Sequence, residues 1–534
     1  MIKIIIFFSI LLIAIFVRFY QLENIPAGLH GDAASQGYNA FSILHTGKDK
    51  YGESFPILFR SLGSYQPPLY TYLTIIPVSL FGNTVFSARF ISAFCGVSLV
   101  VVTFLFINQF FNIKKKNILA YIGALTVALV PWSVFFSRLT VEANLGLLLF
   151  VTSMLFFVLS LKRIYLFPVA CFILGLSTHA YYSERLISII FIPVFILFYR
   201  KILFQNKRFI LLGLGIFALL QIPHILILQT GALTRRFDQV SYIDNQSTNN
   251  IISMIKVFIS NFFVYYSPKN LFFDSDTSLG RTMPGLSVFY SWFLIPLFIG
   301  IRYLLKNRLS QSGNLIWLLL IITPIPAGLT GDFFYPLRTL DFLWAMTLVI
   351  SVGIFHIFNI IKIKAAKIFL SFLLIIYSSC LLYISYFVLF KYEKSSYYGY
   401  AYIKLIEKLA EYKNKEVVID TARDSGIGIR MAYLLKYDPN NLQQQLRSQM
   451  KTPYYSSIVN NDEIYNIDNI RTKAMDWGEA CKSNLIMVGD TLAISDENVT
   501  LHKLQLEFEV KDLAGIIALR GFSAGGPDCL SKNE

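Results

Sequence analysis

Residues 25–82, IPAGLHGDAASQGYNAFSILHTGKDKYGESFPILFRSLGSYQPPLYTYLTIIPVSLFG, decide the fold, because they separate two apolar runs without being a short polar linker. The apolar runs are residues 4–17 and 85–106. Connections in compact domains usually have a median of about 4 to 6 residues. A connection of this length, rich in aromatic residues, Gly and Pro, indicates half of a functional site at a membrane surface. Its first acid after the Pro-Ala-Gly turn is Asp32, beside Gly31.

Composition indicates the class of protein. The chain has 534 residues, of which 55% are hydrophobic and 15% charged, whereas soluble domains are about 25% charged. The formal net charge is +15, but the Lys and Arg residues gather in short clusters between apolar runs, where the positive-inside rule places them. We therefore expect a membrane protein that has no nucleic-acid partner.

The apolar runs predict about eleven transmembrane helices, since a bilayer requires about 20 apolar residues per helix. They are residues 4–17, 85–111, 118–136, 145–161, 164–179, 187–199, 209–228, 286–304, 315–329, 340–361 and 368–390. Residues 251–266 are interrupted by Lys256 and predict a helix lying on the membrane surface. The expected class is a polytopic α-helical membrane protein.

Alternate connections carry the basic clusters, so these connections are expected in the cytoplasm together with Lys3. The odd number of spans then puts the C-terminal region on the outer side. Residues 21–82 and 230–285 become outer loops of a domain comprising residues 1–390. The usage of Lys, Ile, Asn and Phe is typical of bacteria, which favours the bacterial inner membrane.

Residues 391–534 differ in character from the apolar part. Helical patterns at 402–412 and 427–437 alternate with strand patterns at 416–421, 484–488 and 501–510. This indicates a small extracytoplasmic α/β domain. It has no Gly-rich phosphate loop, His/Cys cluster or catalytic triad, so a docking or structural role is expected.

Ionisable side chains near the outer ends of spans need partners, because a charge costs on the order of 2.5 to 3.5 kcal/mol at the bilayer centre. The outer side carries both signs of charge. Its candidates are Asp32, Arg138, Glu142, Glu184, Arg185, Asp274, Asp276, Arg281, Arg338 and Asp341. Such a set suits a cavity in which arginines bind an anionic group and a carboxylate acts as base.

The opening loop resembles that of GT-C glycosyltransferases of the protein O-mannosyltransferase type, including the bacterial aminoarabinose transferases (glycosyltransferase family 39-like). The residues that carry this resemblance are Arg18, Leu22 with Pro26, Gly31-Asp32, Ala40 to Thr46-Gly47, Tyr51-Gly52 with Pro56, PPLYTYL at 67–73, LFG at 80–82, Ser87-Ala88-Arg89 and Ser92-Ala93. It covers about the first 200 residues well and continues more loosely in spacing. It implies a GT-C fold and an inverting transfer of sugar from a polyprenyl phosphate to a protein, lipid or glycan acceptor on the outer face.

The same resemblance implies roles for single residues. Asp32 is then the catalytic base, and Glu142 resembles the second acid of the family. Arg185, Arg281 and Arg338 are implied to bind the donor phosphate. Tyr65, Gln66, Arg138 and Tyr182 would line the substrate cavity.

Each role has a structural alternative. Asp32 is in a position to cap the helix that follows, and Glu142 lies four residues after Arg138, where a salt bridge is expected. Arg185 is an alternative interfacial anchor. Arg338 is spaced for pairing with Asp341. For Arg281, the alternative is that it orders the loop in which it lies.

Two departures from the family pattern limit these roles. Many relatives have Asp-Glu where this chain has Asp32-Ala33, so the base assignment depends on one residue. Tyr65-Gln66 replaces the acid and lysine of aminoarabinose transferases, which argues against an aminoarabinose donor. No cofactor is required, and a divalent metal held by Asp32 with Glu142 is the less favoured alternative, since no complete oxygen cage is visible.

Two other classes fit a polytopic chain with buried charges. A secondary transporter usually shows inverted repeats, and none is visible here. A membrane sensor with an external binding domain would leave the outer acids dispensable. The expected partners remain a polyprenyl-linked sugar, the bilayer and an acceptor.

Overall fold

The computed structural model describes residues 2–243, 250–274, 280–307, 311–478 and 484–524. The chain divides into two compact units. The first comprises Met1–Tyr20, Ile91–Gln229 and Leu233–Phe387. The second comprises Gln21–Phe90, Thr230–Ala232 and Val388–Glu534. This grouping differs from the expected domains, because the first outer loop clusters with the C-terminal region.

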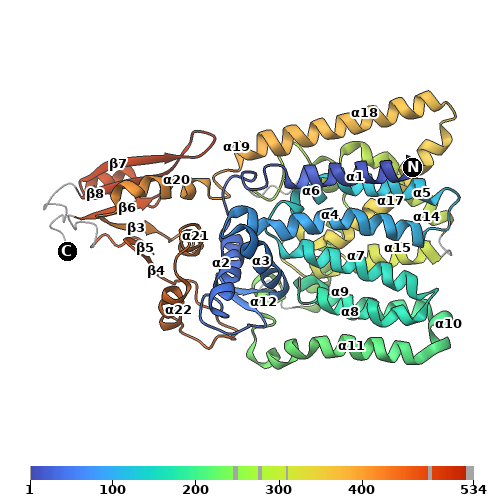
Figure 1. Ribbon diagram of the computed structural model, residues 1–534, viewed down its shortest axis with the longest axis horizontal. Helices are drawn as coiled ribbons and strands as arrows, with labels where there is room; N and C mark the ends of the chain where they lie inside the picture. Colours follow the sequence, from blue (N-terminus) through green and yellow to red (C-terminus); the bar gives the residue numbers. More distant parts are fainter. Residues whose placement is uncertain (1, 244–249, 275–279, 308–310, 479–483, 525–534) are drawn as a thin grey trace. The chain divides into compact units, whose positions relative to one another are not determined.

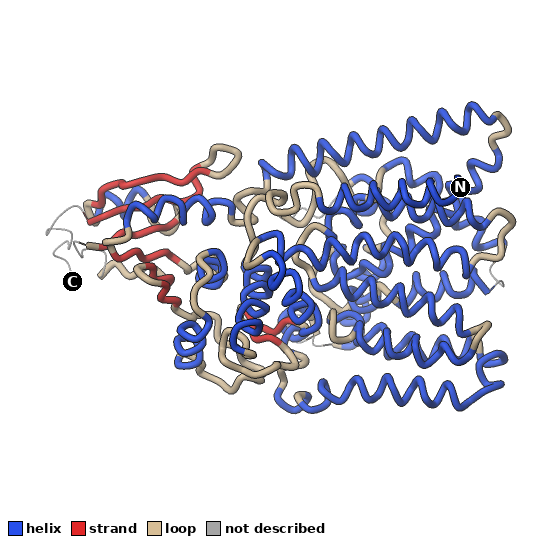
Figure 2. Tube along the Cα trace, in the orientation of Figure 1, coloured by secondary structure: helices blue, strands red, loops and turns tan. Residues whose placement is uncertain are grey.

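The first unit is helical, and every predicted span coincides with a helix or a helix pair (Figure 1). In α4 (Val85–Phe110), only the residues from Ile91 onward belong to this unit. Its other main helices are α1 (Ile2–Phe19), α5 (Lys116–Leu129), α6 (Pro131–Ser137), α7 (Glu142–Ser160), α8 (Phe167–Ser177), α9 (Tyr182–Phe198), α11 (Lys207–Leu226), α14 (Leu294–Lys306), α15 (Gln311–Ile322), α16 (Ile325–Gly328), α17 (Leu340–Ile360) and α18 (Lys364–Leu382). The expected surface helix is α13 (Ile251–Val264). All strands shown red in Figure 2 belong to the second unit.

By length and composition, five of the described helices are able to cross a membrane, or six when a bent pair counts as one span. The bent pair is α5 with α6, at an angle of 54°. Val130 between them is extended, with φ −62° and ψ 134°. The ring of Pro131 explains this, since it disfavours the helical region for the preceding residue. Four shorter apolar helices accompany them; the prediction of eleven spans remains a prediction.

Burial separates inner from outer helices in this unit. The most apolar 18 residues of the helix that contains α17 are 72% buried inside the protein, whereas those of the helix that contains α18 are 17% buried. The outward face of α18 is still apolar, with Ile368, Phe369 and Phe372 exposed. Large apolar faces without a protein neighbour suit contact with lipid, and the chain is a polytopic membrane protein.

The second unit contains a six-stranded sheet of order β4-β5-β3-β6-β8-β7. The strands are β3 (Glu416–Asp420), β4 (Tyr465–Ile467), β5 (Ile470–Lys473), β6 (Leu485–Gly489), β7 (Leu504–Lys511) and β8 (Ile517–Ala524). β3 runs parallel to β5 and β6, and the other pairs are antiparallel. The helices are α20 (Tyr400–Leu409), α21 (Ile427–Leu434), α22 (Pro439–Ser448) and α23 (Asp496–Leu501). The expected α/β character is confirmed.

The opening loop folds into this same unit. It forms helix α2 (Gly31–Thr46), the hairpin β1 (Phe59–Ser61) with β2 (Ser64–Gln66), and α3 (Pro68–Phe81). One hydrophobic core contains Ala34 and Tyr38 of α2 together with Ile427 and Tyr433 of α21. The loop and the tail therefore share a core.

Close packing of α14 on α17 yields a stability prediction. A Cβ on Gly353 would lie 1.8 Å from the carbonyl oxygen of Pro296, so only glycine permits this backbone approach. Gly353→Ala should lower stability by about 1 to 3 kcal/mol through overpacking, measured as the thermal unfolding midpoint in detergent. Gly215→Ala on α11 is the control, since a Cβ there meets no atom within 4 Å. An equal response of both variants would contradict the close packing.

Candidate active site

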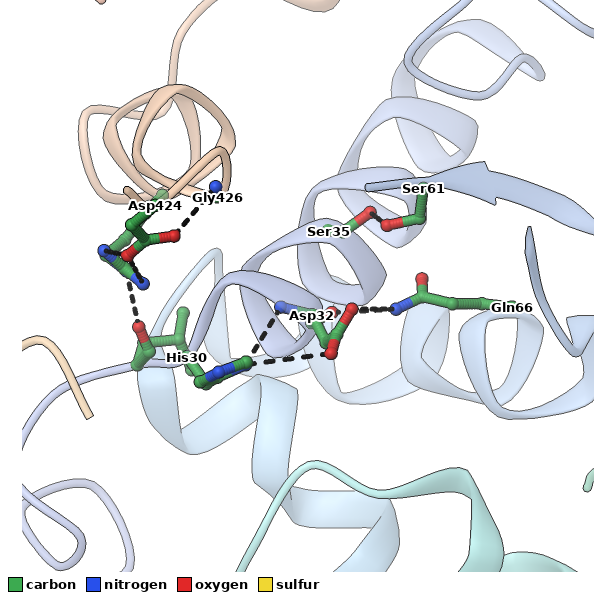
Figure 3. A network of polar contacts seen from close by, with 9 residues as sticks. His30, Asp32, Ser35, Ser61, Gln66, Asp424 and Gly426 are labelled. Atoms are coloured by element: carbon green, nitrogen blue, oxygen red, sulfur yellow. Dashed lines mark hydrogen bonds and ion pairs between the residues drawn. The ribbon is translucent and has the colours of Figure 1, made fainter. Parts of the chain in front are cut away.

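Asp32 lies in the first turn of α2, and the N-cap of that helix is His30. The Asp32 N–H donates to His30 Nδ1 at 3.4 Å, so the expected capping role of Asp32 is wrong. His30 Nδ1 also lies 3.8 Å from Asp32 Oδ2, and Gln66 Nε2 donates to Asp32 Oδ1 at 3.4 Å (Figure 3). The side chain of Asp32 remains 57% exposed. The helix N-terminus favours negative charge at this position, so the carboxylate is accessible, oriented and electrostatically stabilised.

Tyr65 and Gln66 on β2 were both expected to line the substrate cavity, but their surroundings differ. Tyr65 is buried, its hydroxyl donates to the Tyr454 carbonyl at 2.7 Å, and it accepts from the Ser456 N–H at 2.7 Å. Gln66 Oε1 is buried and has no hydrogen-bond partner among the described residues. Tyr65 therefore anchors the hairpin, while Gln66 lies beside the acid.

A buried polar network lies along α2 beyond Asp32. Ser35 Oγ accepts from Ser61 Oγ at 2.8 Å and from Lys50 Nζ at 3.2 Å. Lys50 is 1% exposed. Burial lowers the pKa of the Lys50 ammonium to about 8, although nearby carboxylates, including that of Asp32, oppose the shift. The sequence Lys-Asp-Lys has the pattern of a solvated turn, so sequence reasoning missed this group.

Asp49 beside it is a structural acid. Its carboxylate accepts hydrogen bonds from the N–H groups of Tyr51 and Glu53, both at 2.9 Å, and from the Tyr454 hydroxyl at 2.6 Å. Burial nevertheless raises the pKa of Asp49 to about 6. These three donors fix the turn that carries Lys50.

In the first unit, two predicted arginines gather on one ring. Arg281 lies 4.1 Å and Arg338 lies 5.1 Å from the centre of the Tyr335 ring. Arg338 is in the short helix η7 (Pro336–Thr339), and its Nη2 pairs with Asp332 Oδ2 at 2.6 Å. The expected partner Asp341 is therefore wrong for Arg338, because loop closure brings Asp332 to the guanidinium. Arg338 Nη1 is buried without a hydrogen-bond partner among the described residues.

Glu142 begins α7 and belongs to the surroundings of Tyr181. Burial raises the pKa of the Tyr181 hydroxyl, the Arg338 charge opposes this, and Glu142 adds to it. The predicted acid and the predicted arginine thus act on one buried hydroxyl. Sequence reasoning missed Tyr181 and also Arg236, whose charge acts there too.

Arg185 and Tyr182 lie together in the first turn of α9. The Arg185 guanidinium lies 4.6 Å from the centre of the Tyr182 ring. Its Nε donates to the Thr178 carbonyl and its Nη1 to the Leu233 carbonyl, both at 3.3 Å. Its Nη2 is buried and has no hydrogen-bond partner in the described part of the chain. The arrangement leaves the Nη2 nitrogen of Arg185 able to donate to a ligand.

Arg138 has the contacts of a structural residue. It is fully buried, its Nη1 donates to the Val17 carbonyl and its Nη2 to the Tyr20 carbonyl, both at 2.8 Å. Its guanidinium also lies over the Tyr386 and Phe387 rings. These contacts tie the end of α6 to the end of α1.

Glu184 and Asp341 belong to the outer ionisable residues selected from the sequence, but their pairing with each other was not expected. Asp276 of the same set lies outside the described residues. Glu184 and Asp341 are both buried, their side chains are hydrogen-bonded to each other, and Ser177 Oγ donates to Glu184 at 3.4 Å. Two carboxyl groups share a hydrogen bond only when one is protonated.

Within the described residues, no group of three or more His, Cys, Asp or Glu is able to hold a metal ion. Whether the protein uses a cofactor stays a prediction.

The buried Lys50 yields a pH prediction. Its folded pKa of about 8 lies below the ordinary value of 10.5, so between these values the unfolded chain binds more protons and stability rises with pH. Lys50→Met should remove this contribution. The measurement is the unfolding midpoint of wild type and variant from pH 8 toward 10.5. The midpoint of the wild type should rise relative to that of the variant as pH increases. A constant difference across this range would contradict the burial of an amine.

Comparisons with known proteins show what this chain is similar to. A family model described as dolichyl-phosphate-mannose-protein mannosyltransferase matches residues 65–227. Among curated proteins, none matches the sequence significantly. The crystal structure of ArnT from Cupriavidus metallidurans bound to undecaprenyl phosphate has a TM-score of 0.56 at 11% identity, with 99% of each chain covered.

Two structures from Archaeoglobus fulgidus are also similar. The oligosaccharyltransferase AglB in complex with an inhibitory peptide and a dolichol-phosphate has a TM-score of 0.50 at 14% identity, covering 81% of this chain and 63% of that one. The oligosaccharyltransferase complex with Zn and sulfate has a TM-score of 0.52 at 14% identity, covering 97% and 73%. This chain thus spans less than two thirds of AglB. At these identities the similarity shows the fold.

Proposed function

We propose that this protein, assigned to the GT-C superfamily of glycosyltransferases by its family-model match and its fold, transfers a sugar from a polyprenyl-phosphate donor to an acceptor on the outer face of the membrane. The observation that carries the proposal is Asp32. It is an exposed carboxylate at a helix N-terminus, held beside His30 and Gln66. The matched family is described by a lipid-phosphate sugar donor, and ArnT was solved with undecaprenyl phosphate.

The proposed chemistry needs one base and one anion site. Asp32 accepts the proton of an acceptor hydroxyl, whose oxygen forms a bond to the anomeric carbon. The bond from that carbon to the phosphate oxygen breaks, its electrons leave with the polyprenyl phosphate, and the configuration inverts. A positioned base typically contributes about 10² to 10⁴ in rate. Phosphate needs little acid assistance as a leaving group, so a general acid is not required.

The arginines of the first unit suit the phosphate. Arg185 Nη2 and Arg338 Nη1 are buried donors without a protein partner among the described residues, and an unmade hydrogen bond of a buried donor is costly. A lipid phosphate supplies oxygens that satisfy both. Arg281 reaches the same aromatic ring as Arg338 and adds positive charge. Glu142 is the proposed second acid, acting through the surroundings of Tyr181.

We also propose a class of acceptor and a membrane location for this enzyme. The acceptor is a protein, lipid or glycan, and the enzyme works in the bacterial inner membrane with a cytoplasmic N-terminus and an outer tail domain. The basic clusters between spans support that orientation. No metal is required in this scheme. A transporter or a sensor remains the alternative, and the Asp32 experiment separates these classes.

Asp32→Asn should reduce transfer by about 10² to 10⁴, because an amide accepts no proton at neutral pH. The assay measures sugar transfer from a labelled polyprenyl-phosphate sugar in membranes. Glu53→Gln, an acid of the same loop, is the matched control and should retain activity. Normal transfer by Asp32→Asn would refute the base, and absence of transfer by wild type would favour the transporter or sensor.

Arg338→Ala should weaken donor binding, because a hydrogen bond to a charged group is worth about 1.5 to 3 kcal/mol, or roughly 10- to 150-fold. The measurement is binding of a labelled polyprenyl phosphate to the detergent-solubilised protein. Arg302→Ala, an exposed arginine on α14, is the control and should bind like wild type. Unchanged binding by Arg338→Ala would show that this arginine lies outside the phosphate site.

A further inference from the structure

Arg430 of α21 is a buried cation, and each of its three side-chain nitrogens donates a hydrogen bond. It is 2% exposed. Its Nε donates to the carbonyl oxygen of Leu29 at 2.8 Å. Its Nη1 and Nη2 both donate to Asp424 Oδ2 at 3.1 Å. The carbonyl group that accepts from Arg430 belongs to the opening loop, three residues before Asp32.

Asp424 connects this arginine to a second contact with the same segment. Its Oδ1 accepts from the Gly426 N–H at 2.9 Å. Gly426 packs against Gly31, and a Cβ on either glycine would lie 3.0 Å from the Cα of the other. The loop from Asp424 to Gly426 therefore fixes the backbone on both sides of the N-cap, at Leu29 through Arg430 and at Gly31 by direct packing.

The chain before Leu29 is held as well. Gly28 forms an antiparallel bridge with Gly399. Arg89 donates from Nη1 to the Pro26 carbonyl at 3.0 Å and also bonds through Nη2 to the Gly28 carbonyl. These contacts fix the backbone conformation of the segment that leads into α2. A loop of Gly and Ala alone would not supply this rigidity, because such residues have little side chain to pack.

We propose that Arg430, locked by Asp424, is a positioning residue for Asp32: the tail domain sets the place of the catalytic carboxylate by holding the first turn of α2. The inference rests on the proposed function. Arg430 contacts neither the carboxylate nor its neighbours His30 and Gln66 in any described hydrogen bond. It acts through the backbone, and it gives the tail domain a part in catalysis rather than only a role as a cap.

The size of the effect follows from geometry. A displacement of about 1 Å in a catalytic group costs on the order of 100-fold in rate. Lysine in place of Arg430 keeps the charge but cannot reach Leu29 and Asp424 with separate planar donors. Arg430→Lys should therefore lower kcat by about 10- to 100-fold, while KM for the donor changes little, because the arginines proposed for the phosphate lie on other segments.

The test compares Arg430→Lys with Arg520→Lys in full-length protein. Arg520 is matched in kind, since its Nη1 donates to Asp496 at 2.7 Å and its Nη2 to the Ile494 carbonyl at 2.6 Å, elsewhere in the tail domain. Hydrogen–deuterium exchange is measured on peptides covering residues 28–38. Only Arg430→Lys should exchange faster there, and only it should lose kcat.

Gly426→Ala gives a second variant that keeps every hydrogen-bonding group. Its methyl group pushes on Gly31 and should lower kcat with the same small change in KM. If Arg430→Lys and Gly426→Ala both keep wild-type kcat while Asp32→Asn is inactive, the positioning role is wrong and the base stands. If Asp32→Asn is fully active, the proposed function fails instead.

Discussion

The buried face of α2 is the constraint on which the second unit depends. Ala34 and Tyr38 are fully buried in one core with Ile429 and Tyr433 of the tail, and the Tyr38 hydroxyl donates to the Tyr437 carbonyl at 2.8 Å. A helix in an isolated loop would leave this face in water, and burial of each large side chain is worth about 1.5 to 3 kcal/mol. The tail thus completes the fold of the opening loop, and the position of Asp32 depends on that completion.

Hydropathy predicted the helices because a bilayer imposes a length and a composition on each span. It could not predict the grouping of the chain, since the pairing of α2 with α21 is a contact between segments about 400 residues apart. In the tail, the apolar strand β6 (LIMVG) was recognisable from its sequence. The three-residue strand β4 and the polar IRTK of β5 have no comparable pattern, because their partners supply the burial.

The candidate residues show the same limit. Sequence motifs selected Asp32 and Arg338 as candidates, but local spacing assigned the capping role of Asp32 and the Asp341 partner of Arg338 incorrectly. Arg338 pairs with Asp332, and His30 caps the helix that Asp32 was expected to cap. Both contacts arise from turns, where backbone conformation decides which side chain arrives. Such turns leave only a weak signal in a single sequence.

The acids and arginines of this chain differ in how fully their polar atoms are hydrogen-bonded. Asp49 and Asp32 lie in the same loop, yet Asp49 is buried and accepts three hydrogen bonds, whereas Asp32 is exposed and held from one side. A buried carboxylate that accepts three hydrogen bonds is well suited to hold a turn and poorly suited to act as a base, since a base needs room for the proton donor. The arginines divide likewise: both terminal nitrogens of Arg138 donate to backbone carbonyls, while Arg185 and Arg338 each keep a buried terminal nitrogen without a described partner. Unsatisfied buried donors are costly, and this cost is the physical reason for proposing that an anionic ligand satisfies them.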